Sequence, residues 1–133
     1  MSRTETYRVH LSRVEHGQVV LKEGAAPPKP PPRRVPTRAA RLLALAHRID
    51  GLVRDGKMTD YAEVALVAGL TRARISQITD MLFLAPSIQE QVLCETKPER
   101  GRERYGERHL RQIVRDHDWD RQVQAFESLL AAN

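Results

Sequence analysis

The chain has 133 residues, 41% of them hydrophobic but only 5% aromatic, so it can form one small domain with appendages and a core of aliphatic residues and alanine. Its net charge of +5 indicates an anionic partner, and nucleic acid is a common partner of small basic proteins. The single cysteine, Cys94, excludes an internal disulfide, and no apolar run is long enough for a membrane span or a signal peptide, so we expect a cytoplasmic protein.

Residues 1–23 are expected to form a β-hairpin arm. Two segments, 6–14 and 18–22, are rich in β-branched residues, and Gly17 between them can take the positive φ of a tight turn. Val14 interrupts the alternation of the first segment, which leaves a bulge or an early turn open. Because a two-stranded hairpin is marginal alone, we expect it to pack on the helical body, on a second copy of the chain or along DNA.

Residues 24–36 are predicted to be a linker. Six of the eight prolines of the chain lie here. Such a run prefers an extended polyproline II path and does not join a helix or a central strand, so it separates the hairpin from the helices expected after residue 36. A ligand for a proline-binding domain is the alternative interpretation.

Residues 37–95 are predicted to form a helical DNA-binding domain. Thr37 is an expected N-cap, Gly56 ends the first helix, and Thr59 or Asp60 caps the next one. Apolar residues at spacings of three and four make one stripe of the first helix. The stripe contains Leu42, Leu43, Ala46, Ile49 and Val53.

A helix-turn-helix is the prediction for residues 61–80. The first helix covers 60–68, Gly69 ends it in the left-handed backbone region, and Thr71 caps a second helix that continues to about Leu82. The positions that such a motif needs to be small, flexible or buried define its core. They are Ala65, Gly69, Ile75 and Ile78.

The second helix of the motif is expected to be the recognition helix, although an ordinary two-helix corner with a solvated polar face is the alternative. Leu70 is expected to be a buried apolar plug behind the turn. Since arginine pairs with guanine and glutamine with adenine, the predicted base contacts are Arg72, Ser76 and Gln77. Contacts to the DNA backbone or to flanking bases are expected from Thr71, Ala73, Arg74 and Asp80.

The segment YAEVALVAGLTRARISQITDMLFLAPSIQEQVL, residues 61–93, resembles the helix-turn-helix of the ParB/KorB-like family. The matching positions are 61–63, 69–71, 74–77 and 82–86. The resemblance implies a small all-helical domain that binds palindromic or repeated duplex DNA sites. The chain lacks the arginine-rich nucleotide-binding portion of partition proteins, so nucleotide hydrolysis is not expected. Its layout also resembles small DNA-binding proteins of bacterial mobile elements, often encoded near site-specific recombinases.

After the motif, Ser87 and Glu90 have the spacing of a capping box at the start of a further helix. The residues of this helix expected in the core are Ile88, Val92 and Leu93. The polar stretch 96–106 is predicted to be a solvated loop. The alternative is that its arginines, Arg100, Arg102 and Arg104, contact phosphates.

Residues 96–133 are predicted to hold two C-terminal helices. The apolar face of the first is made by Leu110, Ile113 and Val114. Asp118 is the expected N-cap of the second helix. Trp119 and Phe126 on that helix are expected either to pack on the body or to form a dimer contact.

No residue pattern predicts an enzyme, a metal site or a cofactor. The five histidines lack metal-ligand spacing, and Tyr105 among several arginines is only a faint candidate nucleophile. The sequence therefore predicts a mainly α, sequence-specific DNA-binding protein that acts as a homodimer, as a transcription regulator or recombination accessory (directionality) factor of a bacterial mobile element. The alternative is an adaptor that binds a recombinase or RNA polymerase and contacts DNA without sequence preference.

Overall fold

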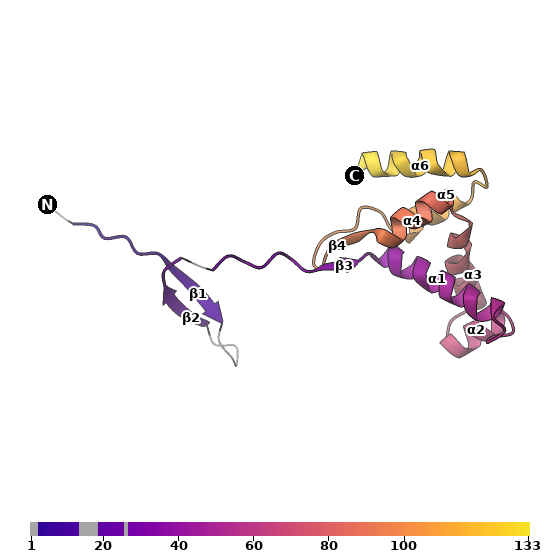
Figure 1. Ribbon diagram of the computed structural model, residues 1–133, viewed down its shortest axis with the longest axis horizontal. Coiled ribbons are helices and arrows are strands. Elements are labelled where there is room, and N and C mark those ends of the chain that lie inside the picture. Colours follow the sequence, from indigo (N-terminus) through magenta and orange to yellow (C-terminus); the bar gives the residue numbers. More distant parts are fainter. Residues whose placement is uncertain (1–2, 14–18, 26) are drawn as a thin grey trace. The chain divides into compact units, whose positions relative to one another are not determined.

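The structure, a computed structural model, describes residues 3–13, 19–25 and 27–133. It consists of two units, Met1–Pro31 and Pro32–Asn133, each of which is compact by itself. Among the described residues it has six α-helices, one 3-10 helix and four short strands, which confirms the mainly α fold class (Figure 1).

The first unit contains the predicted hairpin. Strand β1, Val9–Arg13, pairs antiparallel with β2, Val19–Glu23, and Leu11 lies opposite Leu21. Val14 and Gly17, to which the bulge and the turn were assigned, lie outside the described residues.

In the second unit, α1 covers Arg38–Arg54 and begins where the sequence predicts. The Oγ1 of Thr37 accepts a hydrogen bond from the backbone N–H of Ala40 at 3.0 Å, which satisfies one of the free donors of the first turn. Gly56, just past the C-terminus, has φ 75°. The predicted stripe is the buried face, with Ala39 and Ala40 added and Leu42 and Val53 only partly buried.

The remaining helices follow in short succession. They are α2 (Tyr61–Ala68), α3 (Arg72–Thr79), the 3-10 helix η2 (Asp80–Phe83), α4 (Pro86–Cys94), α5 (Glu107–Val114) and α6 (Trp119–Ala132). The predicted second motif helix thus ends at Thr79 as an α-helix, and the chain continues to Phe83 as a tighter 3-10 helix.

The helical unit has two clusters of buried apolar side chains that meet along α1. One joins the second half of α1 to α2 and α3, through Ala46, Ile49, Val64, Ala65, Ile75 and Ile78. The other joins the first half of α1 to η2, α4, α5 and α6, and its largest members include Leu43, Met81, Ile88, Leu110 and Phe126. Residues 96–133 therefore share a core with 37–95.

A two-stranded ribbon corrects the predicted linker and loop. Strand β3, Arg34–Pro36, pairs antiparallel with β4, Thr96–Pro98, although both stretches were expected to lack regular structure. The prolines fit because the ribbon is only two-stranded, so a missing N–H breaks no central ladder. A regular strand thus begins at Arg34, inside the predicted linker.

The start of α4 differs from the predicted capping box of Ser87 and Glu90. Ala85 is the N-cap residue and Pro86 occupies the first helical turn, where its missing N–H costs nothing. The N–H of Ala85 donates instead to Oε1 of the buried Gln122 at 2.7 Å. The same amide donates from Nε2 to the carbonyl oxygens of Asp116 and Phe83, at 2.7 and 3.3 Å.

In the C-terminal segment the structure corrects the prediction for Tyr105 and separates the two members of the predicted aromatic pair. Tyr105, within the predicted solvated loop, is 4% exposed and packs edge-on against Phe126 with ring centroids 5.3 Å apart. Trp119 is 54% exposed, and so only Phe126 of the predicted aromatic pair is in the core. Leu93 of α4 is also exposed, whereas Asp118 caps α6 as predicted, accepting hydrogen bonds from the N–H groups of residues 120 and 121.

Candidate nucleic-acid interface

The α2–turn–α3 segment is fixed by its own caps. Asp60 Oδ1 accepts from the N–H of Glu63 at 2.9 Å, and Thr71 Oγ1 accepts from the N–H of Arg74 at 3.1 Å. Gly69 has φ 68° and ψ 29°, a left-handed conformation that costs other residues about 1–2 kcal/mol. A turn of only three residues therefore separates the two helices, as the sequence predicts.

Hydrogen bonds also attach α2 to α1. The hydroxyl of Tyr61, at the start of α2, donates to Oδ1 of Asp50 on α1 at 3.0 Å. Partial burial of the ring, followed by this hydrogen bond, raises the pKa of Tyr61 above its usual value. The Nη2 of Arg54 donates to the second oxygen of Asp50 at 2.9 Å.

The inward face of α3 is buried as predicted. Ile75 and Ile78 are almost fully buried, and they belong to the same cluster as Ala65 of α2 and Ile49 of α1. This packing fixes the rotation of α3 about its axis, because moving either isoleucine outward would leave a cavity costing about 2–5 kcal/mol.

The turn residue Leu70 is not the expected plug, since it is 42% exposed. Together with Leu66 at 83% and Val67 at 67% it leaves an apolar patch on α2, which we call the α2 patch. The first motif helix therefore has an exposed apolar surface that the sequence interpretation missed.

The outward face of α3 presents most of the predicted contact residues. Those exposed to solvent are Thr71, Arg72, Ala73, Ser76 and Asp80, whereas Gln77 and Arg74 are half-buried. The guanidinium, hydroxyl and amide groups among them are the donors and acceptors that read base edges in a major groove.

Arg74 is engaged within the protein. Its Nη1 donates to Oε1 of Glu107 at the start of α5, and its Nη2 donates to Oε2 at 3.2 Å, so the pair is bidentate. The same Nη1 also donates to Oε1 of Gln77 at 3.3 Å. Since a guanidinium has no acceptor, the amide oxygen of Gln77 must face Arg74, which leaves its NH2 group free to donate outward.

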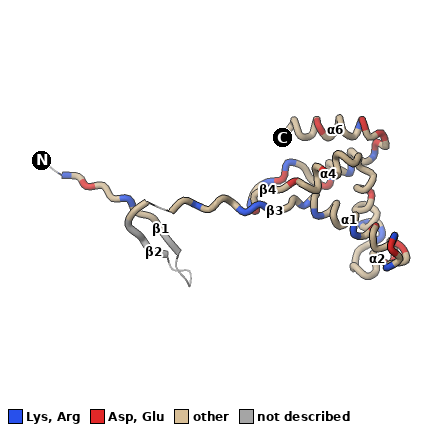
Figure 2. Tube along the Cα trace, viewed as in Figure 1, with Lys and Arg blue, Asp and Glu red and all other residues tan. Residues whose placement is uncertain are grey.

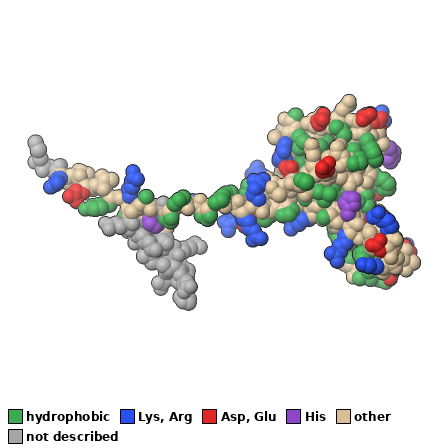
Figure 3. All heavy atoms as spheres, viewed as in Figure 1, with side chains coloured by type: hydrophobic (Ala, Val, Ile, Leu, Met, Phe, Trp, Pro, Cys, Tyr) green, Lys and Arg blue, Asp and Glu red, His purple; other side chains and the backbone are tan. Residues whose placement is uncertain are grey.

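The charge around α3 is not basic. Residues 60–80 contain two arginines and three acidic residues, a net charge of −1, and one of the arginines is paired with Glu107. Figure 2 shows blue and red positions close together where α2 lies, and Figure 3 shows hydrophobic side chains mixed with them. Attraction of a polyanion must therefore come from another part of the chain.

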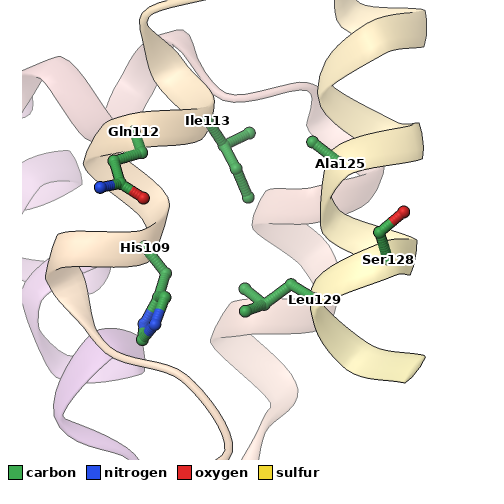
Figure 4. Close-up of a pocket in the computed structure, with 6 residues that line it drawn as sticks. All are labelled: His109, Gln112, Ile113, Ala125, Ser128 and Leu129. Atoms are coloured by element: carbon green, nitrogen blue, oxygen red, sulfur yellow. The ribbon is translucent and has the colours of Figure 1, made fainter. Parts of the chain in front are cut away.

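A groove of about 370 Å³ lies between α5 and α6 (Figure 4). It is lined by His109, Gln112, Ile113, Ala125, Ser128 and Leu129. Ile113 and Leu129 extend into it from opposite helices, and Nδ1 of His109 already accepts the N–H of Gly106 at 3.1 Å. Its other lining residues are two polar ones, Gln112 and Ser128, and the small apolar Ala125.

Tyr105 is not presented to a substrate, because its hydroxyl lies in the core and has no hydrogen-bond partner among the described residues. Burial, followed by the nearby charge of Glu95, raises the pKa of Tyr105 to about 12. The one thiol, Cys94, is exposed on α4. Within the described part of the chain, no three histidine, cysteine or acidic side chains cluster as metal ligands.

None of the helices in the described ranges combines the length and the apolar character required to cross a lipid bilayer. In the comparisons with known proteins, no family model, no curated protein and no solved structure matches the chain.

Proposed function

We propose that the protein binds duplex DNA sequence-specifically, with α3 as its recognition helix. The observation that carries the proposal is the division of α3 into two faces. Its inward face is fixed by Ile75 and Ile78, and its outward face presents Arg72, Ser76 and Gln77 beside a helix N-terminus capped by Thr71. A helix reads the major groove when its rotation about its own axis is fixed and its outward face carries groups that can contact base edges.

Arg72 and Gln77 are proposed as the principal base-contacting residues. Arg72 is exposed and has no ion pair among the described residues, so its fork is free to pair with guanine O6 and N7. Gln77 keeps its amide NH2 and one lone pair of Oε1, which together suffice for a bidentate pair with adenine. Arg74 is assigned a supporting role, because Glu107 already holds its guanidinium.

We further propose that two copies bind a palindromic or repeated site, in the role of a transcription regulator or recombination accessory factor. The resemblance of residues 61–93 to the ParB/KorB-like motif supports this role. Half-sites about 10 base pairs apart, or a multiple of that spacing, would match two recognition helices on one face of the duplex.

Selection of bound sites from random duplex DNA, with the mass of the complex, tests the proposal. On a selected site, Arg72→Ala and Gln77→Ala should each weaken binding by about 1–3 kcal/mol, roughly 5- to 160-fold, and relax base preference at one position. The matched controls are Arg115→Ala and Gln124→Ala, since both residues are exposed and lie outside α3. Unchanged affinity in both α3 variants would refute the proposal.

The second candidate is an adaptor that binds a recombinase or RNA polymerase. The α2 patch supports it, since three neighbouring aliphatic side chains exposed on one helix and turn are typical of a protein-binding surface. If selection recovers no preferred sequence, and Leu66→Ser abolishes capture of a partner by the full chain, the adaptor replaces the DNA reader.

A further inference from the structure

Positive charge is concentrated on β3, β4 and the residues that flank them. Residues 32–41 contain four arginines and no acid, and residues 95–104 contain four cations and three glutamates, a net charge of +5 together. This equals the net charge of the whole chain. Figure 2 shows blue positions along both strands and at the start of α1. We name these side chains the basic ribbon: Arg33, Arg34, Arg38, Arg41, Lys97, Arg100, Arg102 and Arg104.

Backbone hydrogen bonds hold the two stretches of the basic ribbon together. β3 and β4 pair over three positions. Beyond the pairing, the carbonyl of Arg33 accepts the N–H of Glu99 at 2.9 Å, and the N–H of Thr37 donates to the carbonyl of Glu95 at 3.3 Å. The cations therefore stand on a fixed support, which lowers the entropic cost of binding an extended ligand.

The turn that follows β4 is equally constrained. The N–H of Gly101 donates to the carbonyl of Pro98 at 2.7 Å, and a Cβ at Gly101 would lie 2.9 Å from Cδ of Pro98. Lys97 Nζ donates to the carbonyl of Gly101 at 3.0 Å. Arg100 and Arg102 are thus presented by a tight turn with no room for a larger central residue.

Two of the three acidic residues of this region are occupied. A carboxylate oxygen of Glu103 accepts the N–H of Arg38 at 2.6 Å, and Glu95 lies 3.6 Å from the guanidinium of Arg104. Six exposed arginines of the basic ribbon form no ion pair with any described residue. They are Arg33, Arg34, Arg38, Arg41, Arg100 and Arg102, of which Arg34 donates hydrogen bonds to Thr96.

The composition of the surface identifies its ligand. Seven of the eight cations are arginines, whose planar forks match phosphate oxygens, and the exception, Lys97, already donates to the turn. The neighbouring exposed apolar residues are prolines, which supply no large anchor for a protein partner. Because the motif residues 60–80 have a net charge of −1, binding of DNA by α3 needs contacts to the phosphate backbone from another part of the chain.

We propose that the basic ribbon binds the phosphate backbone of duplex DNA beside the base pairs that α3 contacts. The proposal rests on the proposed function for the position of this contact. It assigns affinity to the basic ribbon and sequence preference to α3, two contributions that separate in most DNA-binding proteins.

Arg33→Gln before β3 and Arg102→Gln after β4 test the proposal, with Arg115→Gln as the control, since Arg115 is an exposed arginine outside the basic ribbon. Affinity for a random duplex is measured across a salt series. Each ribbon substitution should reduce the slope of log affinity against log salt by about 0.9, and the double variant by about 1.8, while the control keeps the wild-type slope. The ratio of affinities for selected and random sites should stay within about twofold of the wild type in all variants.

A wild-type slope in the double ribbon variant would overturn the proposal while leaving base reading by α3 intact. If the double ribbon variant loses affinity for single-stranded RNA but keeps its affinity for duplex DNA, the proposal is overturned and the basic ribbon is an RNA-binding surface. Conversely, a reduced slope on random DNA together with no selectable site would retain the basic ribbon as a DNA surface and refute only the proposed function. Unchanged melting temperatures verify that each variant is folded.

Discussion

The ion pair of Arg74 with Glu107 joins α3 to the C-terminal segment, and its removal gives a testable prediction. The two residues are 33 positions apart, and their side chains are 30% and 17% exposed. An exposed pair contributes about 0–1 kcal/mol, whereas removing one member of a fully buried pair costs about 3–5 kcal/mol. At intermediate burial, we expect Glu107→Ala to lower the free energy of unfolding by about 2 kcal/mol.

Part of that cost is the guanidinium left without a carboxylate, so a double-mutant cycle is needed to isolate the pair. We expect Arg74→Ala, Glu107→Ala and the double variant to give a coupling energy of about 1–2 kcal/mol. For a unit near 100 residues, the single substitution at Glu107 corresponds to a melting temperature lower by about 10 °C. Urea titration followed by circular dichroism measures the free energies, and a thermal scan measures the melting temperature.

The exposed pair of Arg54 and Asp50, four residues apart on α1, is the control cycle. Its coupling should be about 0.3–0.5 kcal/mol. A coupling between Arg74 and Glu107 no larger than this control would refute the reasoning that burial strengthens the pair, and with it the role of Glu107 in holding Arg74 beside Gln77.

Three other predictions concern stability. Gly69→Ala should lower the free energy of unfolding by about 1 kcal/mol, because Gly69 has a left-handed φ. Gly51→Ala inside α1, where an added Cβ meets open space, should raise it by about 0.5–1 kcal/mol, and urea midpoints compare the two variants. Tyr105→Phe should reduce the loss of stability that the wild type shows as pH rises from 10 towards 12, because Tyr105 ionises more readily in the unfolded chain than in the fold. The raised pKa of Tyr61 leaves a remaining loss, and urea midpoints at pH 8 and 11 measure the difference. Gln122→Glu should lower the free energy of unfolding by about 2–3 kcal/mol, because the carboxylate cannot donate the two hydrogen bonds that the amide donates. The exposed Gln124→Glu is the control and should leave the thermal melt unchanged.

The caps of Thr37, Asp60, Thr71 and Asp118 could be predicted because a cap hydrogen bond joins residues two or three positions apart. The residue types and their spacing in the sequence are therefore enough to predict each cap hydrogen bond. The buried face of α3 was predictable for the same reason, since Ile75 and Ile78 stand at helical spacing on one side.

The errors arise where a distant residue decides the local structure. Ser87 and Glu90 have capping-box spacing, yet the N–H of Ala85 is satisfied by Gln122, 37 positions away, and the helix starts one residue before Ser87. No local pattern contains that contact. Tyr105 is similar, because it stands in a polar stretch and is buried only through its contact with Phe126.

The sequence predicts the outward residues of the candidate site but not which charged side chains pair with one another or share a surface. The sequence assigns Arg74 to the DNA backbone or flanking bases because it flanks the outward face of the second motif helix, and the fold brings Glu107 to it from another helix. The basic ribbon, in turn, exists only because β3 pairs with β4 across about 60 residues of sequence. Charge along the chain could not place these cations, since pairing decides which of them share a surface.

A protein in which base reading and charge lie on different elements should respond to salt in a characteristic way. If α3 supplies selection and the basic ribbon supplies attraction, added salt weakens binding to selected and random sites through the same phosphate contacts. The ratio between the two affinities then changes little, because the hydrogen bonds of Arg72 and Gln77 to bases release few counterions. In this scheme the motif residues 60–80, with a net charge of −1, depend on the basic ribbon for affinity, whereas the basic ribbon can bind random duplex DNA without them.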